Sequence, residues 1–238
     1  GEPHEAKRAR LAQTLVETGA RAALITLPDS ICWLLNIRGA DIERNPVVHG
    51  FAILHSDATV DLFSEPSKFA GLADHLGPDV RLRSPALFLD AVAALAGPVR
   101  IDAATVPQIV ADRLGDAAVH GTEPCALPKA CKNTAEIEGA AQAHLRDGAA
   151  MVEMLCWLDA QPAEPLRRRD NGLQDISFET IAGTGPNGAI MHYRVTEETD
   201  SLLEDGHLLV LDSGGQYLDG TTDITRTIAI GTPPRDAC

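Results

Sequence analysis

The stretch HLLVLDSGGQYLDGTTDITRTIAI, residues 207–230, places Asp212 at the end of one apolar segment and Asp223 at the start of the next. Glycine turns at Gly214-Gly215 and Asp219-Gly220 separate the segments, so a chain that folds back between them brings both carboxylates to one place. Such carboxylates repel each other unless a cation lies between them, and hard divalent cations prefer oxygen ligands. Either Asp alone would be explained as the cap of a turn. Together they predict two adjacent strands that carry a metal site, with Asp212 and Asp223 as ligands.

Upstream of this stretch, the sequence predicts a long helix. Asn133 and Glu136 have the spacing of a helix N-cap and its reciprocal partner. The helix is expected to run to about Gln161, where Pro162 ends it. Its predicted apolar face consists of Ile137, Ala141, Leu145, Gly148, Val152 and Leu155. The strands predicted after this helix cover residues 189–193, 208–212 and 224–230.

The first half of the chain alternates short apolar strands with helix-like segments, which is typical of an α/β domain. The predicted strands are 21–27, 31–36, 99–102 and a hairpin over 47–64, and the predicted helices are 5–18 and segments near 66–76 and 85–96. Pro124 and Pro128 then interrupt the pattern. The expected domains are therefore residues 1–128 and 129–238.

The composition is that of an acidic globular protein. Its 238 residues are 45% hydrophobic and carry a formal net charge of −14, which argues against nucleic acid as a partner because phosphate binding needs a cationic face. No apolar run approaches the roughly 20 residues of a membrane span, and the polar N-terminus lacks the apolar core of a secretory signal, so a cytoplasmic location without a membrane partner is expected. The five cysteines form no CxxC pair, and we expect reduced thiols.

Four segments, in this order, resemble the aminopeptidase P (Xaa-Pro aminopeptidase) branch of the creatinase and methionine-aminopeptidase superfamily. They are DSICWLLNIRGADIERNP (29–46), CALPKACKNTAEIEGAAQAHLRDGAA (125–150), SFETIAGTGPNGAIMHYR (177–194) and LEDGHLLVLDSGGQYLDGTTDITRT (203–227). The resemblance covers nearly the whole chain. It implies an α/β creatinase-type N-terminal domain followed by an incomplete α+β pita-bread catalytic domain.

The resemblance also implies a chemistry. A pita-bread peptidase of this kind holds two divalent ions, usually manganese, with ligands in the order Asp, Asp, His, Glu and Glu. Asp212 matches the first ligand and Asp223 the second, while His192 matches a catalytic histidine that lines the substrate site and hydrogen-bonds the substrate or its intermediate. The implied reaction is hydrolysis of the N-terminal Xaa-Pro bond of proline-containing peptides by a metal-activated water, in a homodimer.

The sequence departs from the family pattern at its end. It stops at Cys238, and the later His and the two Glu ligands have no counterpart in it. Two carboxylates without the other three ligands are expected to bind metal weakly, so the activity of this form is left open.

Three alternatives remain beside the peptidase. A non-catalytic peptide- or protein-binding protein could keep the same fold. An aspartic protease could use Asp212-Ser213-Gly214, since that mechanism needs two carboxylates sharing a proton, which a homodimer can supply. A related dinuclear or creatinase-type hydrolase would act on a different substrate.

Overall fold

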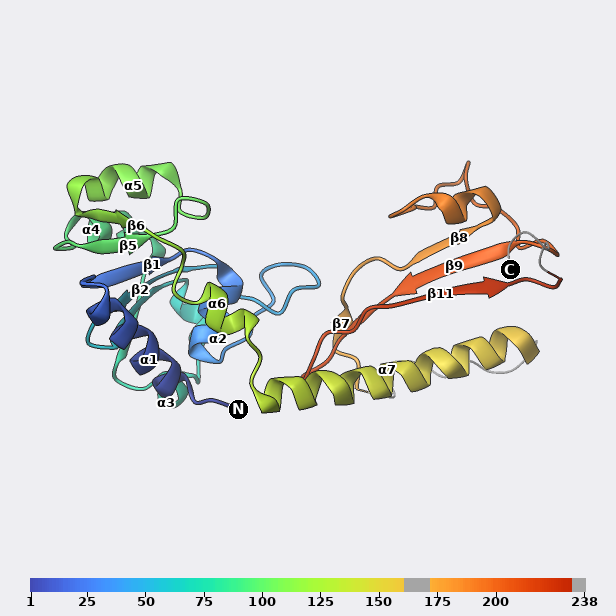
Figure 1. The fold of residues 1–238 in the computed structure, drawn as a ribbon, viewed down its shortest axis with the longest axis horizontal. Coiled ribbons are helices and arrows are strands. Elements are labelled where there is room, and N and C mark those ends of the chain that lie inside the picture. Colours follow the sequence, from blue (N-terminus) through green and yellow to red (C-terminus); the bar gives the residue numbers. More distant parts are fainter. Residues whose placement is uncertain (161–171, 233–238) are drawn as a thin grey trace. The chain divides into compact units, whose positions relative to one another are not determined.

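The computed structural model describes residues 1–160 and 172–232, and the chain divides into two compact units, Gly1–Asn133 and Thr134–Cys238 (Figure 1). Along the chain, the boundary between the units lies between Asn133 and Thr134. The sequence-based division into residues 1–128 and 129–238 stays a prediction about domains. Within the described part of the chain, no helix is both long enough and apolar enough to cross a membrane.

The N-terminal unit is built on a mixed six-stranded sheet with strand order β4-β3-β2-β1-β5-β6. Its strands are β1 (Ala22–Ile25), β2 (Phe51–His55), β3 (Val60–Phe63), β4 (Val80–Arg83), β5 (Val99–Ile101) and β6 (Ala118–His120). Strand β2 pairs antiparallel with both β1 and β3, and the other pairs are parallel. The predicted hairpin and the strands predicted around β1 and β5 are therefore confirmed.

Helices cover both faces of this sheet. They are α1 (His4–Glu17), α2 (Pro28–Leu35), α3 (Ala73–Leu76), α4 (Phe88–Ala93), α5 (Gln108–Leu114) and α6 (Ala126–Ala130), with 3-10 turns at Pro66–Phe69, Pro85–Leu87 and Gly115–Ala117. Ile25 packs in one hydrophobic cluster with residues of α1 and α2, while Leu24 packs in a second cluster with residues of α4 and α5. Alternate residues of β1 thus face opposite cores, which explains why the strand is apolar throughout.

The strand predicted over residues 31–36 is wrong, because this segment belongs to helix α2. Pro28 stands in the first helical turn, where its missing amide hydrogen costs nothing, and Asn36 ends the helix in the left-handed conformation. Ile31, Leu34 and Leu35 are fully buried at helical spacing. A short apolar run fits a buried helix as well as a strand, and here the flanking proline decides between them.

A buried carboxylate joins β2, β3 and β4. Asp61 is 7% exposed and accepts hydrogen bonds from His55 Nε2 at 2.8 Å and Arg81 Nε at 2.9 Å, with Arg83 Nε also at 2.9 Å. Burial alone would raise the pKa of Asp61, but these hydrogen bonds and charges outweigh it and hold the pKa below its ordinary value.

This network predicts an acid-dependent loss of stability. A carboxylate whose pKa is lower in the folded state stabilises the protein above its unfolded pKa, and that stabilisation disappears as the pH falls through the folded pKa. Asp61→Asn should therefore lower the free energy of unfolding by about 1–3 kcal/mol at pH 7, and the difference should shrink as the pH falls below about 4. Urea denaturation at pH 7 and pH 3 measures both values, and an equal difference at the two pH values would contradict the assignment.

The C-terminal unit consists of one long helix and a three-stranded antiparallel sheet. Helix α7 (Thr134–Ala160) confirms the predicted long helix, although Gln161 and Pro162 lie outside the described residues. The sheet has the order β11-β9-β8, formed by β8 (Ile181–Thr184), β9 (Leu208–Ser213) and β11 (Ile224–Ala229). A small second sheet pairs β7 (Asp175–Ile176) with β10 (Gly215–Gln216). Figure 1 shows α7 running along the three-stranded sheet.

Most of the predicted apolar face of α7 is wrong, although Leu155 does pack against the core of this unit. Ile137, Leu145 and Val152 are each more than half exposed. Over residues 134–158, the buried residues of the helix are instead Ala143, Asp147, Ala150 and Met151, and Met151 packs with Leu211 of β9 and Ile224 of β11. The apolar pattern selects the wrong side because the buried face contains small residues and a carboxylate.

The strand predicted over residues 189–193 is also wrong, since the paired strand lies earlier, at β8. Residues Gly185–Ala189 form a 3-10 turn, and the Tyr193 amide donates to the Ile190 carbonyl in a further turn. A Cβ at Gly183 would lie 2.7 Å from the Asn187 carbonyl oxygen. The glycine therefore lets the chain fold back directly after β8.

Candidate metal and substrate site

The two aspartates of the opening stretch come together at one end of the strand pair β9–β11. Asp212 lies opposite Thr225, and Ser213 lies opposite Ile224, so Asp223 immediately precedes the paired part of β11. The Asp212 carboxyl group lies close enough to Asp223 to raise the pKa of the Asp223 carboxyl group. The convergence expected from the sequence is therefore present in the fold.

The Asp212 and Asp223 carboxyl groups repel each other when both are charged. Partial desolvation and the neighbouring Asp212 carboxyl raise the pKa of Asp223, and His144 on α7 acts in the opposite direction. Asp212 is also held by the Thr225 hydroxyl, which donates to its Oδ1 at 2.9 Å. A divalent cation would relieve the repulsion, and the oxygen donors suit a hard cation. The residues present thus fit a metal.

The carboxylate pair supplies only part of a coordination shell. Across residues 1–160 and 172–232, no group of three or more His, Cys, Asp or Glu side chains could hold a metal ion. The expectation of weak metal binding by two carboxylates alone stays a prediction.

His192 lies in the loop that follows β8. Its backbone adopts φ 58°, a left-handed conformation that is uncommon outside glycine, and its side chain is exposed. The neighbouring Tyr193 is buried, and its hydroxyl donates to the Thr199 carbonyl at 2.7 Å. In the described part of the chain, no hydrogen bond or ion pair joins His192 to either aspartate. The structure therefore fixes the loop beside His192 and leaves its imidazole open to solvent.

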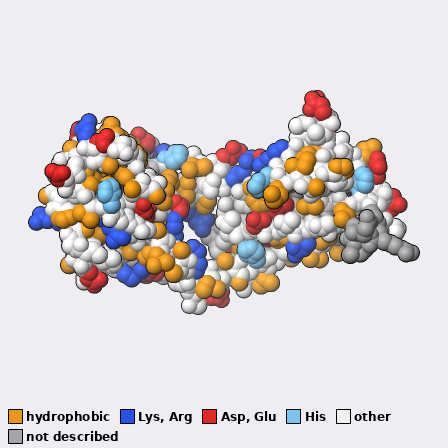
Figure 2. All heavy atoms as spheres, turned by 45° about the horizontal axis from the view of Figure 1, so that its top comes forward, with side chains coloured by type: hydrophobic (Ala, Val, Ile, Leu, Met, Phe, Trp, Pro, Cys, Tyr) orange, Lys and Arg blue, Asp and Glu red, His pale blue; other side chains and the backbone are white. Residues whose placement is uncertain are grey.

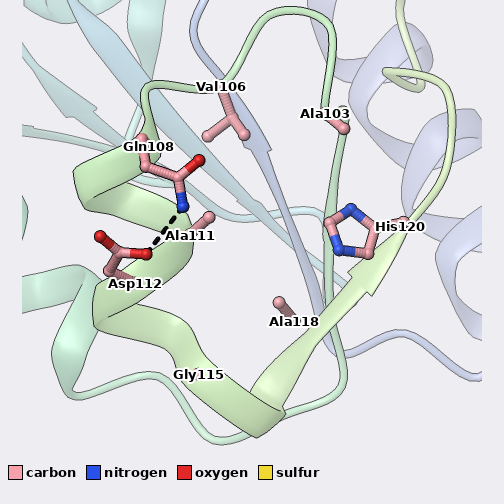
Figure 3. Close-up of a pocket in the computed structure, with 8 residues that line it drawn as sticks. All are labelled: Ala103, Val106, Gln108, Ala111, Asp112, Gly115, Ala118 and His120. Carbon is pink, nitrogen blue, oxygen red and sulfur yellow. Dashed lines mark hydrogen bonds between the residues drawn. The ribbon is translucent and has the colours of Figure 1, made fainter.

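The described residues line at least two pockets. One, of about 270 Å³, is lined by Glu179, Thr180, Ala182, Tyr193, Arg194 and Val195. Tyr193 and Arg194 directly follow His192 in the chain. The other, of about 260 Å³, lies in the N-terminal unit between α5 and the edge strand β6 (Figure 3). There His120 faces the space, and the Gln108 amide donates to Asp112 at 2.7 Å. The first pocket is the one next to a predicted site residue.

Sequence reasoning missed the groups that hold the turn between the two aspartates. Thr222 and Tyr217 both donate hydrogen bonds to Asp147 of α7. The sequence contains no local signal for this role of Asp147, because α7 also carries Glu136, Glu138 and Glu153.

The face drawn in Figure 2 shows acidic, basic and hydrophobic side chains interspersed.

Comparison with known families gives two matches. Residues 1–136 match the creatinase/prolidase N-terminal domain, and residues 126–237 match metallopeptidase family M24. A Laccaria bicolor protein named "Probable Xaa-Pro aminopeptidase P" is 35% identical over 98% of this chain and 40% of its own length. A protein of the same name from Aspergillus niger is 33% identical over 98% of this chain and 42% of its own length. The chain thus spans about 40% of the length of these relatives.

Solved structures give the same fold. An X-prolyl aminopeptidase from Caenorhabditis elegans, described as a cytosolic enzyme with a di-nuclear active site, superposes with a TM-score of 0.85 at 26% identity and covers 99% of this chain and 42% of that one. A Xaa-Pro dipeptidase from Bacillus anthracis has a TM-score of 0.74 at 20% identity, over 98% of this chain and 67% of that one. The predicted fold class, a creatinase-type α/β domain followed by part of a pita-bread domain, is confirmed by these matches.

Proposed function

The chain belongs to the creatinase/prolidase family of M24 metallopeptidases, and from this premise we propose that it is a dinuclear, metal-dependent aminopeptidase that hydrolyses the N-terminal Xaa-Pro bond of peptides. The names of the curated relatives support this substrate class. The single observation that carries the proposal is that β9 and β11 pair with Asp212 opposite Thr225, which brings Asp212 and Asp223 to the same end of the two strands.

Asp212 and Asp223 are proposed to hold the metal, with Thr225 keeping the Asp212 carboxylate in place through its 2.9 Å hydrogen bond. Bound divalent ions, proposed to be manganese, would polarise the substrate carbonyl and lower the pKa of a water molecule. The di-nuclear site of the Caenorhabditis elegans enzyme supports the proposal of two ions. His192 is proposed as the catalytic histidine that hydrogen-bonds the substrate, and the pocket lined by the next two residues, Tyr193 and Arg194, supports this proposal.

We further propose that the protein acts in the cytoplasm as a homodimer, with proline-containing peptides as partners and with neither nucleic acid nor membrane as a binding partner. The cytosolic location of the Caenorhabditis elegans relative supports the compartment. The formal net charge of −14 supports the exclusion of nucleic acid.

The test of the function is peptide hydrolysis with and without metal. With Mn²⁺ present, the protein with its full set of five ligands should release the N-terminal residue of an Xaa-Pro peptide, and chelation should return the rate to background, because uncatalysed peptide hydrolysis is many orders of magnitude slower. In the same assay, His192→Ala should lower kcat/KM while Mn²⁺ binding is retained, since His192 would touch the substrate and not the metal.

Each alternative has its own outcome in that assay. Hydrolysis that survives complete metal removal and stops with a pepstatin-like inhibitor would support the aspartic protease. Peptide binding without hydrolysis at any metal concentration would support the non-catalytic protein. Hydrolysis of other substrates in preference to Xaa-Pro peptides would support a related creatinase-type hydrolase.

A further inference from the structure

A carboxylate lies at the centre of the buried face of α7. The Asp147 side chain has no exposed surface. Its Oδ1 accepts a hydrogen bond from the Tyr217 hydroxyl at 2.7 Å, and its Oδ2 accepts one from the Thr222 hydroxyl at 2.5 Å. Both donors belong to the turn-rich segment that connects Asp212 to Asp223. One helix side chain therefore ties down the segment that separates the two candidate metal ligands.

Thr222, the residue immediately before Asp223, is tightly held. It is 1% exposed. Its hydroxyl donates to Asp147 and also accepts from the Gly215 amide at 2.9 Å. Its own amide donates to the Gly215 carbonyl at 2.8 Å, and its carbonyl accepts from the Ser177 hydroxyl at 3.1 Å. These hydrogen bonds fix both the backbone and the side chain of Thr222, which leaves the backbone little freedom at the point where Asp223 begins.

The segment also packs tightly on α7. A Cβ at Gly139 of the helix would lie 2.6 Å from the Asp219 carbonyl oxygen, and a Cβ at Gly220 would lie 3.0 Å from the Ala140 Cα. Arg146 adds an ion pair with Asp219. Glycines on both sides thus let the two backbones approach directly, so that the helix can act as a rigid platform for the segment.

The cost of burying Asp147 points to a role beyond packing. A buried carboxylate pays a large desolvation cost, and an apolar side chain of similar size often stabilises a fold as well or better. What a carboxylate offers is two short, strong, directional hydrogen bonds to hydroxyl donors. Those bonds hold Thr222 in one position. Because Asp223 is the next residue, they also fix where its backbone starts.

We propose that Asp147 is a positioning residue for the candidate metal centre, which holds Thr222 through its hydroxyl and so sets the separation of the Asp223 and Asp212 carboxylates. Asp147 touches neither metal nor substrate in this role. The inference rests on the proposed function in one respect, namely that the two aspartates bind metal. The geometric part, that Asp147 orders the segment before Asp223, does not depend on that function.

The test compares two pairs of variants with Mn²⁺ itself as the probe. Thr222→Val keeps the shape of the side chain but removes the hydroxyl, and Thr222→Ser restores a hydroxyl. Asp147→Asn changes the buried carboxylate, and Asp61→Asn makes the same change at a buried carboxylate of the other unit. Thr222→Val and Asp147→Asn should weaken Mn²⁺ binding about tenfold or more, as is typical when the partners of metal ligands are removed. Thr222→Ser and Asp61→Asn should bind Mn²⁺ as the unsubstituted protein does.

Amide hydrogen exchange gives the readout that does not need metal. The Thr222 and Ser177 amides donate to the Gly215 and Gly214 carbonyls, which Thr222→Val leaves in place. Their protection should nevertheless fall in Thr222→Val and in Asp147→Asn, because the segment is no longer held to α7. Should Asp147→Asn fail to fold in a thermal melt, Thr222→Val carries the test alone.

The possible failures are distinguishable. Unchanged exchange protection in Thr222→Val, or Mn²⁺ binding equal to that of Thr222→Ser, overturns the positioning role. If the unsubstituted protein binds no more Mn²⁺ than Asp212→Asn does, the proposed metal site fails, and the exchange data then decide the positioning of the segment by themselves. Equal weakening by Asp61→Asn would show that general destabilisation, and not positioning, lowers the affinity.

Discussion

Asp212→Asn is expected to reduce Mn²⁺ binding to background while leaving the protein as stable as before, or more stable. The binding is lost because the amide is neutral and attracts a hard cation far less than the carboxylate does. Stability is retained because the substitution removes one of two carboxyl groups that face each other across β9 and the start of β11, and like charges in contact repel. The Thr225 hydroxyl can still donate to the amide oxygen.

The measurement is Mn²⁺ titration followed by electron paramagnetic resonance, with a thermal melt of the same metal-free sample. Asp219→Asn is the matched control, since Asp219 lies in the segment between the two candidate ligands and takes part in the ion pair with Arg146. Losing an exposed ion pair changes stability by less than about 1 kcal/mol, and this variant should keep its Mn²⁺ binding. Unchanged Mn²⁺ binding in Asp212→Asn would refute the assignment of that residue as a ligand, whatever the fate of the control.

The position of the aspartate pair could be predicted from sequence because local rules decide it. Apolar segments of strand length flank two glycine turns, and antiparallel pairing of such segments brings the end of the first beside the start of the second. The register of β9 and β11 follows that expectation, with Asp212 opposite Thr225. The metal-binding role of Asp212 and Asp223 follows from two converging carboxylates and from the family resemblance, whereas the role of His192 follows from the resemblance alone. These roles remain predictions.

The errors arose where a local pattern fits two structures and a distant contact selects between them. Residues 31–36 are apolar in a way that suits a strand, but they bury Ile31, Leu34 and Leu35 along one side of a helix. The buried face of α7 could not be predicted from its local pattern for the same reason, namely that distant contacts select it. Asp147 reads as a solvent-exposed residue until Tyr217 and Thr222, far along the chain, supply its hydrogen bonds. No periodicity in the helix itself reports those partners.

Gly214→Ala is expected to be among the most damaging single-methyl additions in the C-terminal unit. A Cβ at Gly214 would lie 2.1 Å from the Thr222 carbonyl oxygen and 2.3 Å from the Ser177 hydroxyl oxygen, both far inside van der Waals contact. The closest atom is backbone, and it belongs to the residue that precedes Asp223, so it cannot move without moving the candidate ligand. Overpacking of this kind typically costs about 1–3 kcal/mol and sometimes more, and we expect about 3 kcal/mol or more here.

Gly148→Ala is the matched control for that prediction. Gly148 lies on α7 in the same unit, and a Cβ there would meet no atom within 4 Å. Alanine is favoured over glycine in a helix, so this variant should be neutral or stabilising by up to about 1 kcal/mol. Urea denaturation of both variants separates the two cases, and Mn²⁺ titration of Gly214→Ala under folding conditions should show weakened binding. A Gly214→Ala protein with the stability and Mn²⁺ affinity of Gly148→Ala would contradict the close approach of Gly214 to the Thr222 carbonyl. Other contacts would then have to set the separation of the two aspartates.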